Sequence, residues 1–491
     1  MTDFGSLVRA HGKTQLEIKN RYPLPTEKTR VSYSIDAFMF TPAQLGINDE
    51  RFSVDQFFSD VKSHTRFSIS YVPLARLVDP GCSISPLTRI RNYLDTATFS
   101  ADMSEHRVLY ELRTLANLFS AEMKATYRLL SDIASAGISQ HLVKKTEKFL
   151  DEASVFLQQF REFHSRFMEP SINSRIRTAM RWSDESISLS AEKMLFYLHR
   201  VFDGHKIQSV IENMMKAENQ HRREMKYPSV LKNKNDSEIE RILYRESILK
   251  KWAQTVLYMS SEETGTNRKI GHILAGVAAA AAMTFAIVAT FFAERLFASY
   301  SIPWAMIIVV SYMLKDRIKE ILRGILLRIM PRFISDRTEK LVDQILQKNV
   351  GKTKSMVRLV QLKETPHSVQ AVRNAGANPF QTILPPENII HFRKDITIKS
   401  GKLMKEHSRI EAVTEIIRVK MDRFLEEMDD AKKLLRTWKD GRLSAVKGKR
   451  VYHINLVLRL VSSEEDEEQV SRYRLVVNRQ GIQRIEEVVS R

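Results

Sequence analysis

The side chains that most often carry out chemistry are those of histidine, cysteine, aspartate, glutamate and serine, and this sequence places none of them in a familiar catalytic pattern. It contains no GxxxxGK followed by Ser or Thr, no GxGxxG, no HExxH, no CxxC and no GxSxG. Those patterns build phosphate-binding loops, dinucleotide sites, zinc proteases, thiolate metal sites and serine hydrolases. An enzyme would therefore need an unfamiliar site assembled from distant residues.

Histidine and carboxylate residues form small clusters whose spacing does not suit a metal ion. His199 and His205 are six residues apart on a predicted helix, which places them on different faces, whereas joint ligation needs a spacing of three or four. Cys82 is the only cysteine, which excludes an intramolecular disulfide and a thiolate zinc cluster. The remaining groups are HRR at 221–223, HFRKD at 391–395, and the scattered carboxylates Asp36, Asp49, Glu50 and Asp55. We expect no catalytic residue, metal or cofactor.

Two long uncharged runs lie back to back in the middle of the chain. Residues 271–292 contain no Asp, Glu, Lys or Arg, and the run 296–314 is of similar length. About 20 apolar residues in a helix suffice to cross the hydrocarbon core of a bilayer. The sequence predicts a two-helix transmembrane hairpin over 268–314. The alternative, a hairpin buried in a soluble core, is disfavoured because soluble helices rarely run this long without a charged face.

Small residues recur every four positions in the first run, a spacing that lets two helix backbones approach closely in lipid. The residues expected to pack against another membrane helix are Gly271, Ala275, Gly276, Ala279, Ala280 and Thr284. The second run is the expected partner, and self-association between subunits is the alternative.

Basic residues flank the pair on both outer sides, while the link between the runs offers Arg295 alone. By the positive-inside rule, both termini are then cytoplasmic, which predicts a multi-pass protein of the bacterial inner membrane. The cations expected to contact anionic lipid are Arg268, Lys269, Lys315, Arg317, Lys319, Arg323 and Arg328.

The charge balance favours anionic partners, because the 491 residues carry a net charge of +19. The basic clusters at 221–234, 352–358 and 446–450 contain few aromatic residues, whereas RNA-binding surfaces usually interleave the two. No helix-turn-helix, RRM or KH pattern is present. Lipid is therefore the expected anionic partner, and nucleic acid is disfavoured.

Helical periodicity dominates the predicted secondary structure, so the expected fold class is mainly α with a small β part (α+β). Apolar residues recur at three and four through 103–260, and at seven through 406–438, as at Ile410, Ile417 and Phe424. The predicted units are an N-terminal mixed α/β region (1–100), a cytoplasmic helical bundle (101–262), the transmembrane hairpin (268–314), a basic amphipathic juxtamembrane helix (315–348), a connector (349–400), a long packed helix (401–440) and a C-terminal β meander (446–491).

The strands are predicted at the two ends of the chain. Residues 30–40 and 451–461 alternate apolar with polar, and two further strands follow residue 470. Because three strands alone make a poor core, we expect both ends of the chain to share one sheet.

The expected function is that of a membrane-anchored cytoplasmic scaffold or sensor that acts through contacts with an unidentified protein partner. Two alternatives stay open. One is an oligomeric channel or transport component built on the hairpin, and the other is an enzyme with an unrecognised cytoplasmic site.

Overall fold

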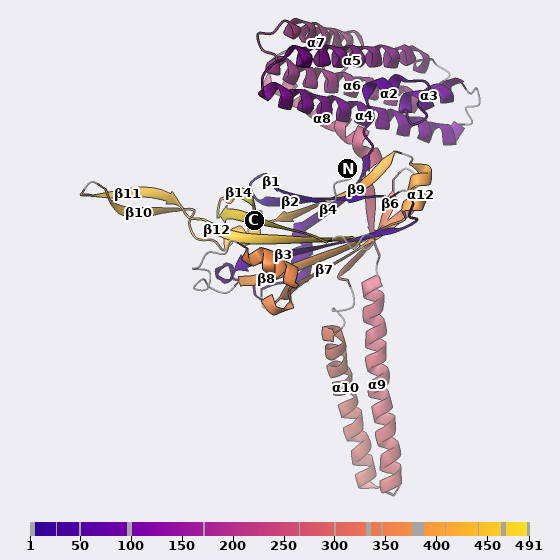
Figure 1. Ribbon diagram of the computed structural model, residues 1–491. Coiled ribbons are helices and arrows are strands. Elements are labelled where there is room, and N and C mark those ends of the chain that lie inside the picture. The colour runs from indigo at the N-terminus through magenta and orange to yellow at the C-terminus, as the bar shows by residue number, and fades with distance from the viewer. Residues whose placement is uncertain are drawn as a thin grey trace.

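The chain has a mixed α+β fold with several sheets, 51% helical and 31% strand, so the β part is larger than predicted. The computed structural model describes residues 5–25, 27–48, 51–95, 101–169, 172–264, 266–298, 301–329, 335–344, 347–375, 387–407, 409–439, 441–462 and 468–488. Three parts follow one another along a single axis (Figure 1). A helical domain lies at one end and a β domain in the middle. At the other end a helical hairpin projects, formed by α9 (Thr266–Leu296) and α10 (Ile302–Ile329).

The helical domain is an amphipathic bundle around an aromatic core. Side-chain caps start its helices where the sequence offers them: Ser139 accepts a hydrogen bond from the backbone N–H of Leu142, and Asn235 from that of Glu238. Phe119 and Phe156 stack in the core with ring centroids 4.7 Å apart. The helices are α4 (Ala101–Ser135), α5 (Gln140–Phe167), α6 (Ser174–Val201), α7 (Ile207–Glu224) and α8 (Asp236–Gln254), and α2 (Leu74–Val78) and α3 (Pro86–Asp95) join the same core. The domain therefore begins before the predicted boundary at residue 100.

The β domain contains a large and a small sheet that enclose one apolar core, together with a separate two-stranded sheet of β10 (Lys432–Lys439) and β11 (Arg442–Lys449). The large sheet has the order β14 (Gly481–Val488), β13 (Glu468–Asn478), β12 (Tyr452–Ser462), β3 (Val31–Pro42), β8 (Glu387–Ile398), β7 (Lys348–Val360), β6 (Arg337–Asp343) and β5 (Met259–Glu263). The small sheet has the order β1 (Gly5–His11), β2 (Gln15–Pro23), β9 (Ile410–Lys420) and β4 (Val61–Ile69). Short helices α1 (Val54–Asp60) and α11 (His367–Asn374) flank these sheets.

The prediction that both ends of the chain share a sheet is confirmed. β12 pairs antiparallel with β3, from Asn455 opposite Phe40 to Ser462 opposite Tyr33. The meander β12–β13–β14 is present as predicted. Because Leu456 and Leu458 are fully buried, the C-terminal strands supply core to the N-terminal ones.

The prediction of one long helix over 401–440 is wrong. The segment forms α12 (Ser400–Glu406), β9, α13 (Asp422–Glu426) and β10 (Lys432–Lys439). β9 is rich in β-branched residues, which favour strands, and it lies between β2 and β4. Ile410 and Ile417 are buried there, so their spacing of seven reflects a covered central strand instead of a helical seam.

Two further predictions are wrong in their element type. The amphipathic helix predicted over 315–348 ends at Ile329, and Arg337–Asp343 is strand β6. The connector predicted over 349–400 holds β7 and β8, two strands of the large sheet. Val357, Ile390 and Ile396 are buried there, and the alternation in the β8 burial pattern is the local signal of a strand.

Candidate functional site

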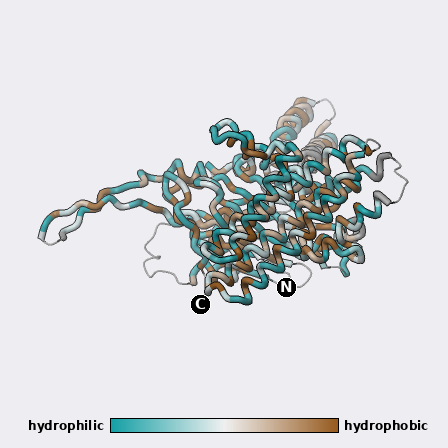
Figure 2. The backbone as a smooth tube through the Cα atoms, turned by 90° about the horizontal axis from the view of Figure 1, so that it is seen from above, coloured by the Kyte–Doolittle hydropathy of each residue, from teal (hydrophilic) through white to brown (hydrophobic). Residues whose placement is uncertain are grey.

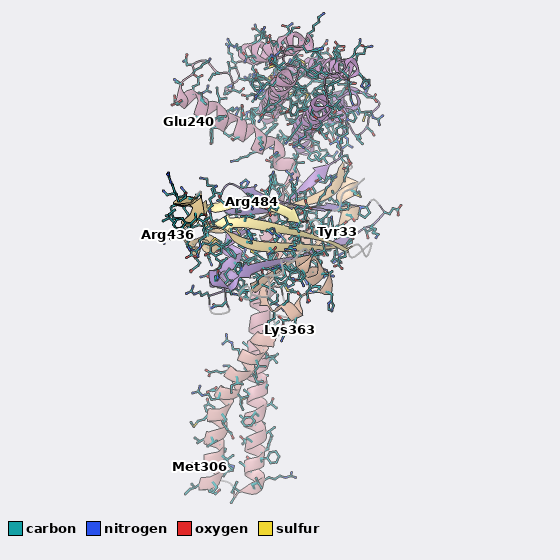
Figure 3. All side chains as sticks on the ribbon, turned by 60° about the vertical axis from the view of Figure 1, so that its left-hand side comes forward. Tyr33, Glu240, Met306, Lys363, Arg436 and Arg484 are labelled. Atoms are coloured by element: carbon teal, nitrogen blue, oxygen red, sulfur yellow. The ribbon has the colours of Figure 1, made fainter. Side chains whose placement is uncertain are left out.

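The helical hairpin is the feature that the sequence analysis singled out, and it stands away from the rest of the molecule (Figures 1 and 3). Leu274, Ala278, Ala282 and Ala293 of α9 are buried, and so is Ser311 of α10. Since α9 and α10 lie side by side, these residues mark the seam between them. The small alanine side chains allow the close approach of the two helices.

The small residues predicted to pack fall on two different faces of α9. Ala275 and Ala279 are half-buried beside the seam, whereas Gly276, Ala280 and Thr284 are exposed. Gly271 belongs to α9, but its surroundings lie outside the described residues. The sequence holds several parallel rows of small residues, and periodicity alone cannot select the row that meets α10.

Outside the seam, the hairpin exposes large apolar side chains. Ile273 is 65% exposed, Phe291 65%, and Ile302 82%. Of the described helices, one segment, Ile273–Leu296, is long and apolar enough to cross a membrane, and 17% of it is buried. In α10 the apolar stretch from Ile302 ends at Leu314 and charged residues follow. Composition alone therefore supports one membrane helix and not a multi-pass arrangement.

Four of the cations predicted to contact lipid line the polar part of α10: Lys315, Arg317, Lys319 and Arg323. Lys315 is half-buried, with its Nζ 3.9 Å from the ring centroid of Tyr312. Arg317 forms an ion pair with Glu320 at 3.5 Å. Lys319 and Arg323 are exposed. Arg268, Lys269 and Arg328 lie in the two helices, but their side chains are outside the described part of the chain.

The two strands that flank the hairpin are neighbours in the large sheet. β5 precedes α9 and β6 follows α10, and they pair antiparallel from Met259 opposite Asp343 to Glu263 opposite Glu339. Thr264 donates its backbone N–H to the carbonyl of Thr338 at 2.9 Å. The two outer ends of the hairpin are therefore held together on one side.

Sequence reasoning missed a buried polar cluster in the helical domain. The Oδ2 atom of Asp184 lies 2.7 Å from Nε2 of His221 and accepts a hydrogen bond from Tyr227 at 2.6 Å. Burial alone raises the pKa of the Asp184 carboxyl, but these two hydrogen bonds and the charge of Arg161 outweigh it and lower the pKa. Burial and the Asp184 charge raise the pKa of Tyr227. Asp184 therefore stays ionised and Tyr227 keeps its proton.

A second buried carboxylate adjoins the first. Glu185 accepts hydrogen bonds from Arg245 at 2.6 Å and from the backbone N–H of Ser229 at 3.1 Å. Arg222 pairs with Glu192. These contacts clamp α6 to α7 and α8. The sequence signal was two acids at 184–185 on the apolar face of a helix, in phase with Met180 and Ile187.

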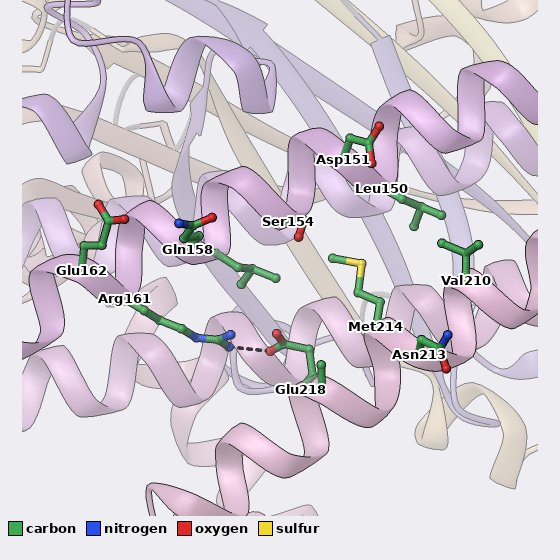
Figure 4. Close-up of a pocket in the computed structure, with 12 residues that line it drawn as sticks. Leu150, Asp151, Ser154, Gln158, Arg161, Glu162, Val210, Asn213, Met214 and Glu218 are labelled. Carbon is green, nitrogen blue, oxygen red and sulfur yellow. Dashed lines mark hydrogen bonds and ion pairs between the residues drawn. The ribbon is translucent and has the colours of Figure 1, made fainter.

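A groove of about 790 Å³ lies beside this cluster between α5 and α7. Leu150, Val210 and Met214 line its apolar part, and Arg161 and Glu218 face each other across it at 2.7 Å (Figure 4). Such a groove, apolar with charged rims, suits a side chain or helix of a protein partner.

A polar cluster joins the helical and β domains. His407 follows α12, and its Nδ1 lies 2.8 Å from the hydroxyl of Tyr110 on α4. Its Nε2 lies 2.5 Å from Oδ2 of Asp343 on β6. Next to it, Arg409 forms an ion pair with Glu111 at 2.8 Å, both almost fully buried. Burial raises the pKa of Tyr110 to about 12.

The remaining candidate side chains serve local contacts. His199 pairs with Glu212 at 2.9 Å, and His205 accepts a hydrogen bond from the N–H of Ile207. His391 of HFRKD pairs with Asp36 at 2.8 Å. Asp55 is exposed, and Asp49 and Glu50 lie outside the described residues. Within the described ranges, no three His, Cys, Asp or Glu residues gather closely enough to hold a metal ion.

Comparison with protein families, curated proteins and solved structures finds no match to this chain.

Proposed function

We infer that the protein is a membrane-anchored scaffold or sensor whose α9–α10 hairpin enters the bilayer and whose helical domain meets a protein partner. The observation that carries this proposal is a hairpin that projects alone and presents large apolar side chains outward along both helices (Figure 3). Transfer of these side chains from water into lipid is favourable by on the order of 10 kcal/mol in total. Water is therefore a poor solvent for this hairpin.

The pairing of β5 with β6 supports passage of both helices. A chain that crosses the bilayer through α9 must return through α10, because β5 and β6 are hydrogen-bonded neighbours in one sheet. The two helices then cross together or stay out together. A single crossing would separate the strands and break the sheet.

The short apolar stretch of α10 sets how the hairpin is seated. Ile302–Leu314 spans roughly 20 Å at about 1.5 Å per residue, against about 30 Å of hydrocarbon. Lys315, Arg317 and Lys319 then lie in the leaflet nearer the β domain. Their long side chains reach the headgroups by snorkelling, as basic side chains near helix ends do. This seating supports the proposed contact with anionic lipid.

The helical domain lies at the end farthest from the hairpin (Figure 1), where a partner has free access to it. The groove between α5 and α7 supplies the contact surface. Ala217→Arg would fill the groove with a long side chain. We expect this change to reduce crosslinking to the partner while membrane association stays unchanged.

Single-cysteine labelling tests the anchor. Cys82 is the only cysteine and is buried, so Cys82→Ser gives a background without thiols. Ser261→Cys lies before α9, Ser301→Cys at the turn, and Lys363→Cys after α10. A membrane-impermeant maleimide should label Ser301→Cys from the side opposite to the other two. Labelling of all three from one side would overturn the crossing.

A further inference from the structure

A basic two-stranded ribbon projects sideways from the β domain. β10 pairs antiparallel with β11 (Arg442–Lys449), from Lys432 opposite Lys449 to Lys439 opposite Arg442. Gly441, with φ of 71°, forms part of the turn at its tip. Figures 1 and 2 show the ribbon extending beyond the rest of the molecule. At its base, the backbone N–H of Arg450 donates to the carbonyl of Ala431 at 2.9 Å.

The ribbon concentrates positive charge. Residues 432–449 hold seven Lys and Arg against one Asp, a net charge of +6. The described cations are exposed and form no ion pair with the described part of the chain: Lys432, Lys433, Arg436, Arg442, Lys447 and Lys449. In Figure 3, Arg436 stands at the outer edge of the molecule. These charges are therefore accessible to an anionic partner.

Both faces of the ribbon mix cations with apolar side chains. Directly opposite residues share a face, so Trp438 and Leu443 lie together on one face, and Leu435 and Val446 on the other. Trp438 is 74% exposed and Leu435 66%. Neither face is wholly apolar, and neither is free of charge.

This distribution distinguishes between anionic partners. A flat bilayer meets one face of a ribbon, and interfacial elements accordingly carry their apolar residues on one side. Tip-first insertion would take Lys439 and Arg442 into lipid before Trp438, which is costly. A second copy of a chain with net charge +19 is repelled by the ribbon. The ribbon is better suited to a groove that has anionic walls on both sides.

We propose that the β10–β11 ribbon binds in a groove of duplex nucleic acid. The major groove is about 12 Å wide and admits a two-stranded β-ribbon between two rows of phosphates. Eight residues per strand reach about 26 Å, the length of roughly eight base pairs. Lysine and arginine on both faces then contact phosphates, and Trp438 with Leu443 contacts apolar base surface near the tip.

The sequence analysis disfavoured nucleic acid because the basic clusters had few aromatic neighbours. Strand pairing changes the neighbourhood of one cluster, 446–450. It places Lys447 opposite Leu434, and Trp438 lies on the same face. The segment 432–439 itself interleaves cations with Trp438, but the sequence analysis assigned it to a long packed helix and did not count it among the basic clusters. Strand pairing adds Lys447 and Lys449 to the face that carries Trp438.

The test measures binding of the full-length chain, in neutral detergent, to a fluorescent mixed-sequence duplex of about 30 base pairs over about 50–300 mM salt. Arg436→Gln/Arg442→Gln/Lys447→Gln should make the slope of log affinity against log salt shallower by about 2 to 3, since each phosphate contact contributes about 0.9. Affinity at about 100 mM salt should fall at least about tenfold. Trp438→Ala should weaken binding several-fold without changing the slope.

A matched control removes three exposed lysines of α5, as Lys144→Gln/Lys145→Gln/Lys148→Gln. It changes net charge equally, so its slope should stay close to that of the unmodified chain. Equal loss in both triple variants, or no duplex binding, would overturn the proposal. Ribbon-dependent sedimentation with anionic vesicles, or ribbon-dependent self-association, without duplex binding would assign the surface to lipid or to a second copy instead. A variant that joins Ala431 to Arg450 through Asn-Gly removes the ribbon at its closed base, and it should lose duplex binding as well.

Discussion

A buried ion pair joins the two sheets of the β domain, and it provides a stringent test of the packing. Lys394 on β8 lies 2.5 Å from Glu415 on β9, and both are almost fully buried. Lys394 also donates to the hydroxyl of Ser63 at 2.7 Å. Glu415 accepts hydrogen bonds from Ser63 at 3.0 Å and from Tyr22 at 3.2 Å. Every charge in this site therefore has a partner.

Lys394→Met removes the cation and leaves Glu415 as an unpaired buried carboxylate. Removal of one partner of such a pair destabilises a protein by about 3–5 kcal/mol. Lys394→Met/Glu415→Leu removes both charges. The remaining loss is the buried Tyr22 hydroxyl left without its Glu415 acceptor, about 1–3 kcal/mol, and the hydrogen bond of half-buried Ser63, about 0.5–1.5 kcal/mol. The double variant should therefore be more stable than the single variant by about 1 kcal/mol.

The assay must report on the β domain alone. The four tryptophans lie in α6, α8, α10 and the ribbon, so tryptophan fluorescence does not follow this core. Hydrogen exchange of the peptide 410–420, which covers β9, reports on this core directly. The single variant should lose more protection there than the double variant. Equal protection in the two variants would refute the claim that Lys394 neutralises Glu415 across the core.

Three further predictions concern the other contacts. Burial lowers the pKa of His164, whose Nε2 has no hydrogen-bond partner in the described part of the chain. The unfolded chain then binds the proton more readily than the folded chain. The stability contributed by neutral His164 is therefore present above pH of about 6.5 and is lost as pH falls toward the folded pKa. The difference in melting temperature between pH 7 and pH 5 should be smaller for His164→Gln than for the unmodified chain. Tyr110→Phe leaves Nδ1 of buried His407 unpaired and should lower the free energy of unfolding by about 1–3 kcal/mol. Denaturant unfolding measures this change, and an unchanged midpoint would contradict the contact. Deletion of 452–491 removes strands β12–β14 and exposes β3, so limited proteolysis should degrade residues 5–69 and spare the helices over 101–254.

The helices were predictable because their signals are local. Caps such as Ser139 and Asn235 mark helix starts, and the apolar period through α4–α8 is long. β9 was not predictable as a strand in the same way. It lies between β2 and β4, and its register is set by partners about 350 to 400 residues earlier in the chain. A central strand covered on both faces does not show clean alternation, and its β-branched residues were the signal that remained.

The polar clusters were unpredictable for a related reason. Asp184 meets His221 and Tyr227 only because α6 and the end of α7 pack together. In the sequence these residues are 37 and 43 positions apart. Acids at buried helix positions predict that partners exist, but they do not identify the partners.

The junction cluster and the hairpin are connected by the same two strands. Asp343, which pairs with His407, lies opposite Met259 at the end of β5 that adjoins the helical domain. The other end of β5 leads into α9, and β6 receives the chain after α10. Tyr110 and His407 connect the helical domain to Asp343, and α8 leads into Met259. Both contacts therefore reach β5 and β6 at the end opposite the hairpin. Backbone hydrogen bonds join the two strands to each other. This continuity supports the sensor role proposed above.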